Sequence, residues 1–135
     1  MTAKIIYNGD LRCTSTHLQS QTSILTDAPT DNEGRGEAFS PTDLVAAALG
    51  TCALTTMGIV ARRKQINMDG ATVEVTKIMV SDPRRRIAEI IVKITMPANG
   101  YTEIEQKILE KAAHACPVAA SLHPDLKQTV EISWT

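Results

Sequence analysis

Short runs in which apolar and polar residues alternate recur along the chain and predict six strands. These runs are residues 3–7, 11–17, 20–26, 71–81, 87–96 and 128–134. Asn8-Gly9-Asp10 is a strong turn signal between the first two runs, and Asp82-Pro83 separates the fourth from the fifth. Each of these breaks predicts a hairpin. The Pro- and Gly-containing segment 27–37 is predicted to be a loop.

Helical spacing of apolar residues marks two segments. The first is predicted to run from Pro41 to about residue 65, with Ser40 as N-cap and Asp43 in its first turn. The second covers residues 102–115, where Thr102 and Glu105 form a capping-box pattern. Pro117 interrupts this helix, and a short continuation is expected over residues 118–122.

The order β-β-β-α-β-β-α-β predicts an α+β fold with a mainly antiparallel sheet, formed by one domain over residues 1–135. Aromatic residues are only 3% of the chain, so the core must be built from small aliphatic side chains. The net charge of −1 argues against a nucleic-acid partner. Arg84-Arg85-Arg86 is interpreted as a solvated turn.

Residues 44–61 carry no charge and approach the length of a membrane span. Their glycine, threonine and alanine content favours a buried core helix instead, so no membrane association is expected. The N-terminus has no signal-peptide pattern, and a cytoplasmic location is expected. Three cysteines without such a signal do not suggest a disulfide scaffold.

Cys52 lies inside the first helix and Cys116 directly precedes Pro117 at the end of the second. A free cysteine is often only a small buried hydrophobe, and the alternative is a catalytic thiol. Sequence spacing leaves both interpretations open, because it does not show that the two sulfurs meet. Cys13, in a predicted strand, is interpreted as structural or incidental. His114 and His123 flank Cys116 at a spacing that matches no standard zinc pattern, so no metal site is expected.

Two motifs resemble those of the OsmC/Ohr family, the osmotically inducible and organic-hydroperoxide-resistance proteins. The segment Phe39-Ser-Pro-Thr-Asp-Leu-Val-Ala-Ala-Ala-Leu-Gly-Thr-Cys52 resembles the family's helix motif, a Ser/Asn-Pro start followed by small residues and a cysteine. Cys116-Pro-Val resembles its second motif. The resemblance covers essentially the whole chain.

This resemblance implies an intertwined homodimer in which two long central helices are wrapped by antiparallel sheets. It also implies a thiol-dependent peroxidase that reduces organic hydroperoxides and, less well, hydrogen peroxide, without a cofactor. Cys52 would become a sulfenic acid and then form a disulfide with Cys116. An external dithiol or a lipoylated protein would reduce that disulfide.

One position departs from the family pattern. The family's peroxidases carry a glutamate ten residues before the first cysteine, paired with an N-terminal arginine, whereas Thr42 stands there in this chain. Arg12 and Glu37 are therefore the candidates for activating Cys52. The departure indicates a divergent, OsmC-like branch. It also keeps an alternative function open, that of a small-ligand-binding or redox-sensing dimer without efficient peroxidase activity.

Overall fold

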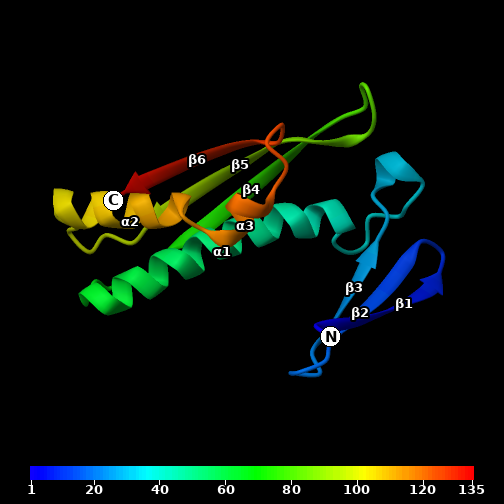
Figure 1. Ribbon diagram of the computed structural model, residues 1–135, viewed down its shortest axis with the longest axis horizontal. Coiled ribbons are helices and arrows are strands. Elements are labelled where there is room, and N and C mark those ends of the chain that lie inside the picture. The colour runs from blue at the N-terminus through cyan, green and yellow to red at the C-terminus, as the bar shows by residue number, and fades with distance from the viewer. The chain divides into compact units, whose positions relative to one another are not determined.

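A computed structural model describes all 135 residues. The chain divides into two compact units, Met1–Val45 and Ala46–Thr135, and each is described by itself (Figure 1). In chain order the elements are β1 (Ala3–Gly9), β2 (Arg12–His17), β3 (Ser23–Asp27), the short 3₁₀ helix η1 (Thr30–Asn32), α1 (Pro41–Lys64), β4 (Thr72–Val80), β5 (Arg86–Met96), α2 (Glu103–His114), α3 (Pro117–Ser121) and β6 (Lys127–Trp134). This order confirms the predicted α+β class.

The first unit contains an antiparallel sheet in the order β1-β2-β3. The predicted turn at its start is confirmed, since Gly9 and Asp10 take positive φ angles of 85° and 52°. The third strand begins at Ser23 and not at Ser20, so the predicted start was too early. Residues 18–22 form a tight turn instead, closed by hydrogen bonds from the His17 amide to the Thr22 carbonyl (2.8 Å) and from the Gln21 amide to the His17 carbonyl (2.8 Å).

The start of α1 follows the predicted capping pattern. The Ser40 hydroxyl accepts a hydrogen bond from the Asp43 amide (3.0 Å), and the Asp43 carboxylate accepts one from the Ser40 amide (2.9 Å). These two bonds satisfy amides that have no partner inside the helix. Beyond Lys64, Gln65 takes a left-handed φ of 57° and ends the helix.

The second unit contains a sheet in the order β4-β5-β6. β4 and β5 form the predicted antiparallel hairpin. β6 pairs with β5 in parallel, whereas the other strand pairs are antiparallel, in keeping with the predicted mainly antiparallel arrangement. The reason for the parallel pairing is the connection, because α2 and α3 carry the chain back across the sheet before β6 begins.

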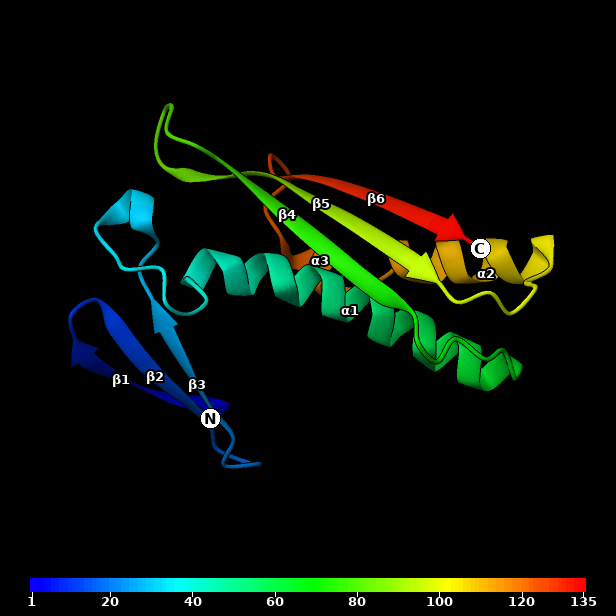
Figure 2. The ribbon, with the colours of Figure 1, turned by 180° about the vertical axis from the view of Figure 1, so that it is seen from behind.

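One face of this second sheet is apolar and covered by helices. Val92 of β5 pairs with Val75 of β4 and Val130 of β6, so all three side chains project to the same side. α1 lies close to this face, since a Cβ added at Gly50 would lie 2.7 Å from Val75 Cγ1. In both ribbon views α2 runs alongside β6 (Figures 1 and 2). The core of the second unit therefore lies between these helices and the sheet. Its fully buried side chains include Met57, Ile90, Val92, Ile94, Met96 and Leu109.

α1 is long and apolar enough to cross a membrane, judged by length and composition alone. This is weak evidence, because the core helix of a soluble protein passes the same test. Residues on one side of α1, including Met57 and Ala53, are buried in the core of the second unit.

Candidate thiol site

The two cysteines singled out in the sequence meet in the second unit. Cys52 lies in the middle of α1, and Cys116 lies in the link between α2 and α3. Both are free thiols, and their side chains are joined by a hydrogen bond. The chain therefore brings together two sulfurs that are distant in sequence.

Local sequence explains how Cys116 is held. α2 ends at His114, and Pro117 cannot continue it but suits the first position of the next helix. Cys116 becomes the N-cap of α3, with extended φ and ψ angles of −78° and 142°. Its sulfur accepts a hydrogen bond from the Ala119 amide at 3.3 Å. The helix expected over residues 118–122 is thus a separate helix that begins at Pro117.

The two thiols differ in their surroundings. Cys116 is 1% exposed, whereas Cys52 is partly exposed. Burial raises the pKa of the Cys116 thiol above its ordinary value; the Ala119 amide opposes this effect and the neighbouring Cys52 adds to it. Cys116 is therefore held as a neutral thiol, and Cys52 is the sulfur that a molecule from solution can reach.

Arg12 and Glu37, the two candidates for activating Cys52, are brought together in the first unit. Arg12 Nη2 donates to Glu37 Oε2 at 2.6 Å and lies 3.4 Å from Asp27 Oδ2. The hydrogen bond that Arg12 donates to Glu37 raises the pKa of the Arg12 guanidinium, so Arg12 is a fixed positive charge. The action of this pair on Cys52 stays a prediction.

Asp27 is a third member of this ion cluster that the sequence did not single out. Its side chain is 1% exposed, and its carboxylate accepts a hydrogen bond from the Glu37 amide at 3.1 Å. That bond lowers the pKa of the Asp27 carboxyl; burial opposes this effect and Arg12 reinforces it. In the sequence, Asp27 resembles any acidic residue at the boundary of a strand and a loop.

Thr42, the residue that departs from the family pattern, lies in the first turn of α1. Its hydroxyl is within hydrogen-bond distance of the Ser40 hydroxyl, at 3.2 Å. Its side chain therefore belongs to the cap of the helix. Cys13 lies in β2 opposite Tyr7 and Thr26, in keeping with a structural role.

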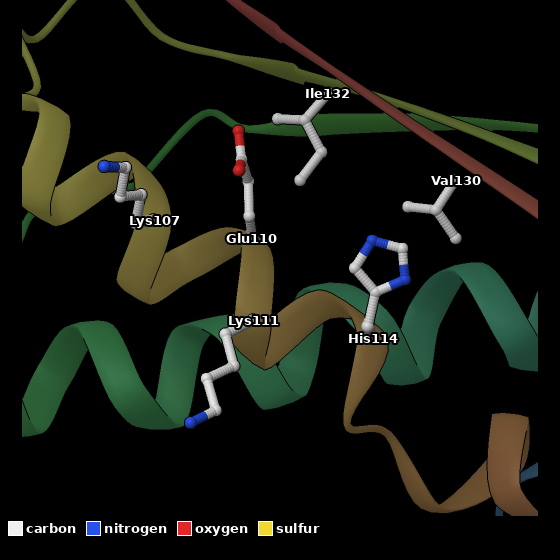
Figure 3. Close-up of a pocket in the computed structure, with 6 residues that line it drawn as sticks. All are labelled: Lys107, Glu110, Lys111, His114, Val130 and Ile132. Carbon is white, nitrogen blue, oxygen red and sulfur yellow. The ribbon is translucent and has the colours of Figure 1, made fainter.

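A shallow groove of about 450 Å³ lies between α2 and β6 (Figure 3). It is lined by Lys107, Glu110, Lys111, His114, Val130 and Ile132. Glu110 and His114 point toward the strand, whereas Lys111 points away from it (Figure 3). Glu110 already accepts a hydrogen bond from Trp134 Nε1 at 3.1 Å. The groove is thus a charged surface feature. Elsewhere in the chain, too, no group of three or more His, Cys, Asp or Glu side chains is arranged to hold a metal ion.

The fold places the chain in a class of small α+β proteins, and the comparisons with solved structures agree with this class. A protein of Psychrobacter arcticus, provisionally described as an osmotic stress induced and detoxification response protein, is 50% identical, with a TM-score of 0.93 over 98% of this chain and 96% of its own. The organic hydroperoxide resistance protein OhrB of Bacillus subtilis has the same fold, with a TM-score of 0.72 at 18% identity over 98% of each chain. An OsmC-like protein of Mycoplasma pneumoniae gives a TM-score of 0.81 at 21% identity, over 98% of this chain and 95% of its own.

The family model of OsmC-like proteins matches residues 34–131. The chain therefore belongs to the OsmC-like family, as its two cysteine motifs indicated. A comparison with curated proteins found no match.

Proposed function

We propose that this protein is a thiol-dependent peroxidase that reduces organic hydroperoxides and, less well, hydrogen peroxide. One observation carries the proposal: a partly exposed thiol, Cys52, is hydrogen-bonded to a buried second thiol, Cys116. The family and its hydroperoxide-resistance members support it. No metal or organic cofactor is required by this chemistry.

The exposure of the two sulfurs supports Cys52 as the thiol that reacts first. The Cys52 thiolate attacks the outer peroxide oxygen, the O–O bond breaks, and an alcohol leaves after taking a proton. Cys52 is then a sulfenic acid. The Cys116 sulfur attacks the Cys52 sulfur, the hydroxyl leaves as water, and a disulfide forms. An external dithiol, free or attached to a carrier protein as a lipoyl group, returns both residues to thiols.

Mass spectrometry of the fully reduced protein, with Cys13→Ser to remove the third thiol, tests this function. Addition of cumene hydroperoxide should remove two thiols and lower the mass by about 2 Da. Cys52→Ser should reduce peroxide consumption to the uncatalysed rate, whereas Cys116→Ser should accumulate a sulfenic acid that dimedone traps. Full turnover by Cys52→Ser, or two thiols that stay free in excess peroxide, would overturn the proposal.

The proposed peroxidase acts as a homodimer in the cytoplasm. Strand β1 leaves large apolar side chains exposed on both of its faces, with Ile5 and Tyr7 on one and Ile6 on the other. Large apolar side chains left exposed together on one strand are typical of a protein–protein interface. Burial of these side chains against a second copy is the simplest way to remove them from water.

The alternative function is a binding module or redox sensor whose cysteines play little part in peroxide turnover. The groove between α2 and β6 is a candidate ligand site in the second unit, and its lining does not favour a small apolar ligand. Four of its six lining side chains are charged or titratable. Thiol chemistry is accordingly the better-supported function.

A further inference from the structure

The proposed peroxidase cycle ends with reduction of a Cys52–Cys116 disulfide, and the geometry around the two sulfurs points to the order of that step. We propose that the reductant thiolate attacks the sulfur of Cys52, that Cys116 is the leaving thiolate, and that the Ala119 amide stabilises it. This inference rests on the proposed function and adds to it the site of attack and a positioning group.

The two sulfurs differ in how easily an external thiolate can reach them. In thiol–disulfide exchange the incoming sulfur must approach one sulfur of the disulfide from the side opposite the other. Cys116 is 1% exposed, so no external thiolate can reach its sulfur. Cys52 is partly exposed, and its neighbour Thr51 on α1 is exposed. Attack is therefore directed to Cys52.

The sulfur of Cys116, as the leaving group, requires stabilisation of its negative charge. A buried thiolate is costly, and a leaving group with a high pKa departs slowly. Burial raises the pKa of Cys116, but the Ala119 amide donates to its sulfur at 3.3 Å and opposes that effect. Charge-assisted hydrogen bonds of this kind strengthen when the acceptor becomes an anion. The donor that the leaving sulfur requires is thus already in place.

Two side-chain hydrogen bonds hold the backbone around the Ala119 amide in place. The Gln128 side-chain amide donates to the Ala119 carbonyl at 2.9 Å, and the Ser121 hydroxyl donates to the Pro117 carbonyl at 2.8 Å. The first bond ties the middle of α3 to strand β6, and the second joins the last residue of α3 to its first. The Ala119 amide therefore keeps its direction when the disulfide opens.

Each bond broken during reduction of the disulfide is matched by a bond formed. One thiolate of an external dithiol forms a bond to the Cys52 sulfur, and the electron pair of the broken S–S bond passes to the Cys116 sulfur, which then takes a proton. The second thiol of the reductant loses its proton and attacks its own partner sulfur in the mixed disulfide. The reductant leaves as a cyclic disulfide, and Cys52 is released as a thiolate.

Peptide mapping of a trapped mixed disulfide tests the site of attack. Cys13→Ser protein is oxidised with diamide, which makes the disulfide whether or not the protein reacts with peroxide. Glutathione, a monothiol, is added briefly, and N-ethylmaleimide in denaturant stops the exchange and labels the buried thiol. Trypsin places Cys52 in peptide 36–62 and Cys116 in peptide 112–127. We expect glutathione on peptide 36–62 and N-ethylmaleimide on peptide 112–127.

The outcomes separate this inference from the proposed function. Glutathione on peptide 112–127, or in equal amounts on both peptides, overturns the order of attack. A disulfide that forms with diamide but not with peroxide counts against the peroxidase and leaves the order of attack to be decided by the peptide map.

Two substitutions at one position test the role of the amide. Ala119→Pro removes the N–H in the first turn of α3, where proline is tolerated, and Ala119→Gly keeps it. We expect Ala119→Pro to slow the exchange roughly three- to tenfold with glutathione still on Cys52, and Ala119→Gly to leave the rate unchanged. Equal rates in the two variants, with matching circular dichroism spectra, would exclude the amide from this role.

Discussion

Asp27 is a buried carboxylate that holds two strands and a loop of the first unit together. It is 1% exposed, faces Arg12 across two strands, and accepts the amide of Glu37 from the loop that follows β3. The loop is also tied back by the Asp27 amide, which donates to the Phe39 carbonyl at 3.1 Å. One residue thus joins the end of β3, the start of β2 and the loop that leads to α1.

This role predicts a specific dependence of stability on pH. The pKa of Asp27 is lower in the folded chain than in the unfolded one, so its ionisation stabilises the fold above about pH 4. That contribution is lost as the pH falls through the lower, folded pKa. Asp27→Asn should therefore unfold at lower urea than the wild type at pH 7, and the difference should shrink as the pH is lowered below about 4.

Urea unfolding at both pH values, followed by circular dichroism, measures this effect. Asp69→Asn, at an exposed carboxylate, serves as the matched control and should behave like the wild type. A difference between Asp27→Asn and the wild type that stays constant down to pH 3 would mean that the ionised carboxylate is not the source of the stabilisation.

At the scale of elements, α1 contains two glycines that differ in the space available for a side chain. A Cβ at Gly50 would lie 2.7 Å from Val75 Cγ1, whereas a Cβ at Gly58 would meet nothing within 4 Å. Alanine favours a helix by about 1 kcal/mol over glycine. Gly58→Ala should therefore stabilise the chain by about 1 kcal/mol, while Gly50→Ala should destabilise it because β4 would have to move away.

Thermal unfolding of the two variants beside the wild type tests this pair, with each glycine serving as the control for the other. The same sign of change in both would contradict the close approach of α1 to β4. A destabilised Gly50→Ala beside a stabilised Gly58→Ala would support it.

Most elements were predictable because their signals are local. Ser40 and Asp43 mark the start of α1, and Thr102 and Glu105 form the predicted capping box of α2. The direction in which β6 pairs was not predictable, since it depends on the path of the chain through α2 and α3. The contact between the thiols depends on the same path, so the cysteines could be named from their motifs, while their meeting had to be seen in the structure.

On the scale of the whole molecule, the exposed apolar side chains of β1 predict self-association. Light scattering after gel filtration should give twice the 14.6 kDa of one chain. Ile5→Glu and Ile6→Glu test the two faces of β1 separately, and at least one of them should yield a single chain because a charge would be buried in the interface. Ile104→Glu changes an isoleucine on α2 that is more exposed than Ile5 or Ile6, and it should not alter the mass.

A wild-type mass of one chain would contradict the proposed dimer. So would an unchanged mass in both β1 variants, because the interface would then lie elsewhere.

The crossover from β5 through α2 and α3 to β6 also bears on how the protein withstands heat. Because Cys116 lies in this crossover, a bond to Cys52 would close a loop of roughly 60 residues and restrict the unfolded chain, which in the chain-entropy model is worth about 4 kcal/mol. A protein oxidised by its substrate would then be harder to melt than the reduced protein. Oxidative stress would leave the chain in its more heat-resistant form until a reductant arrived.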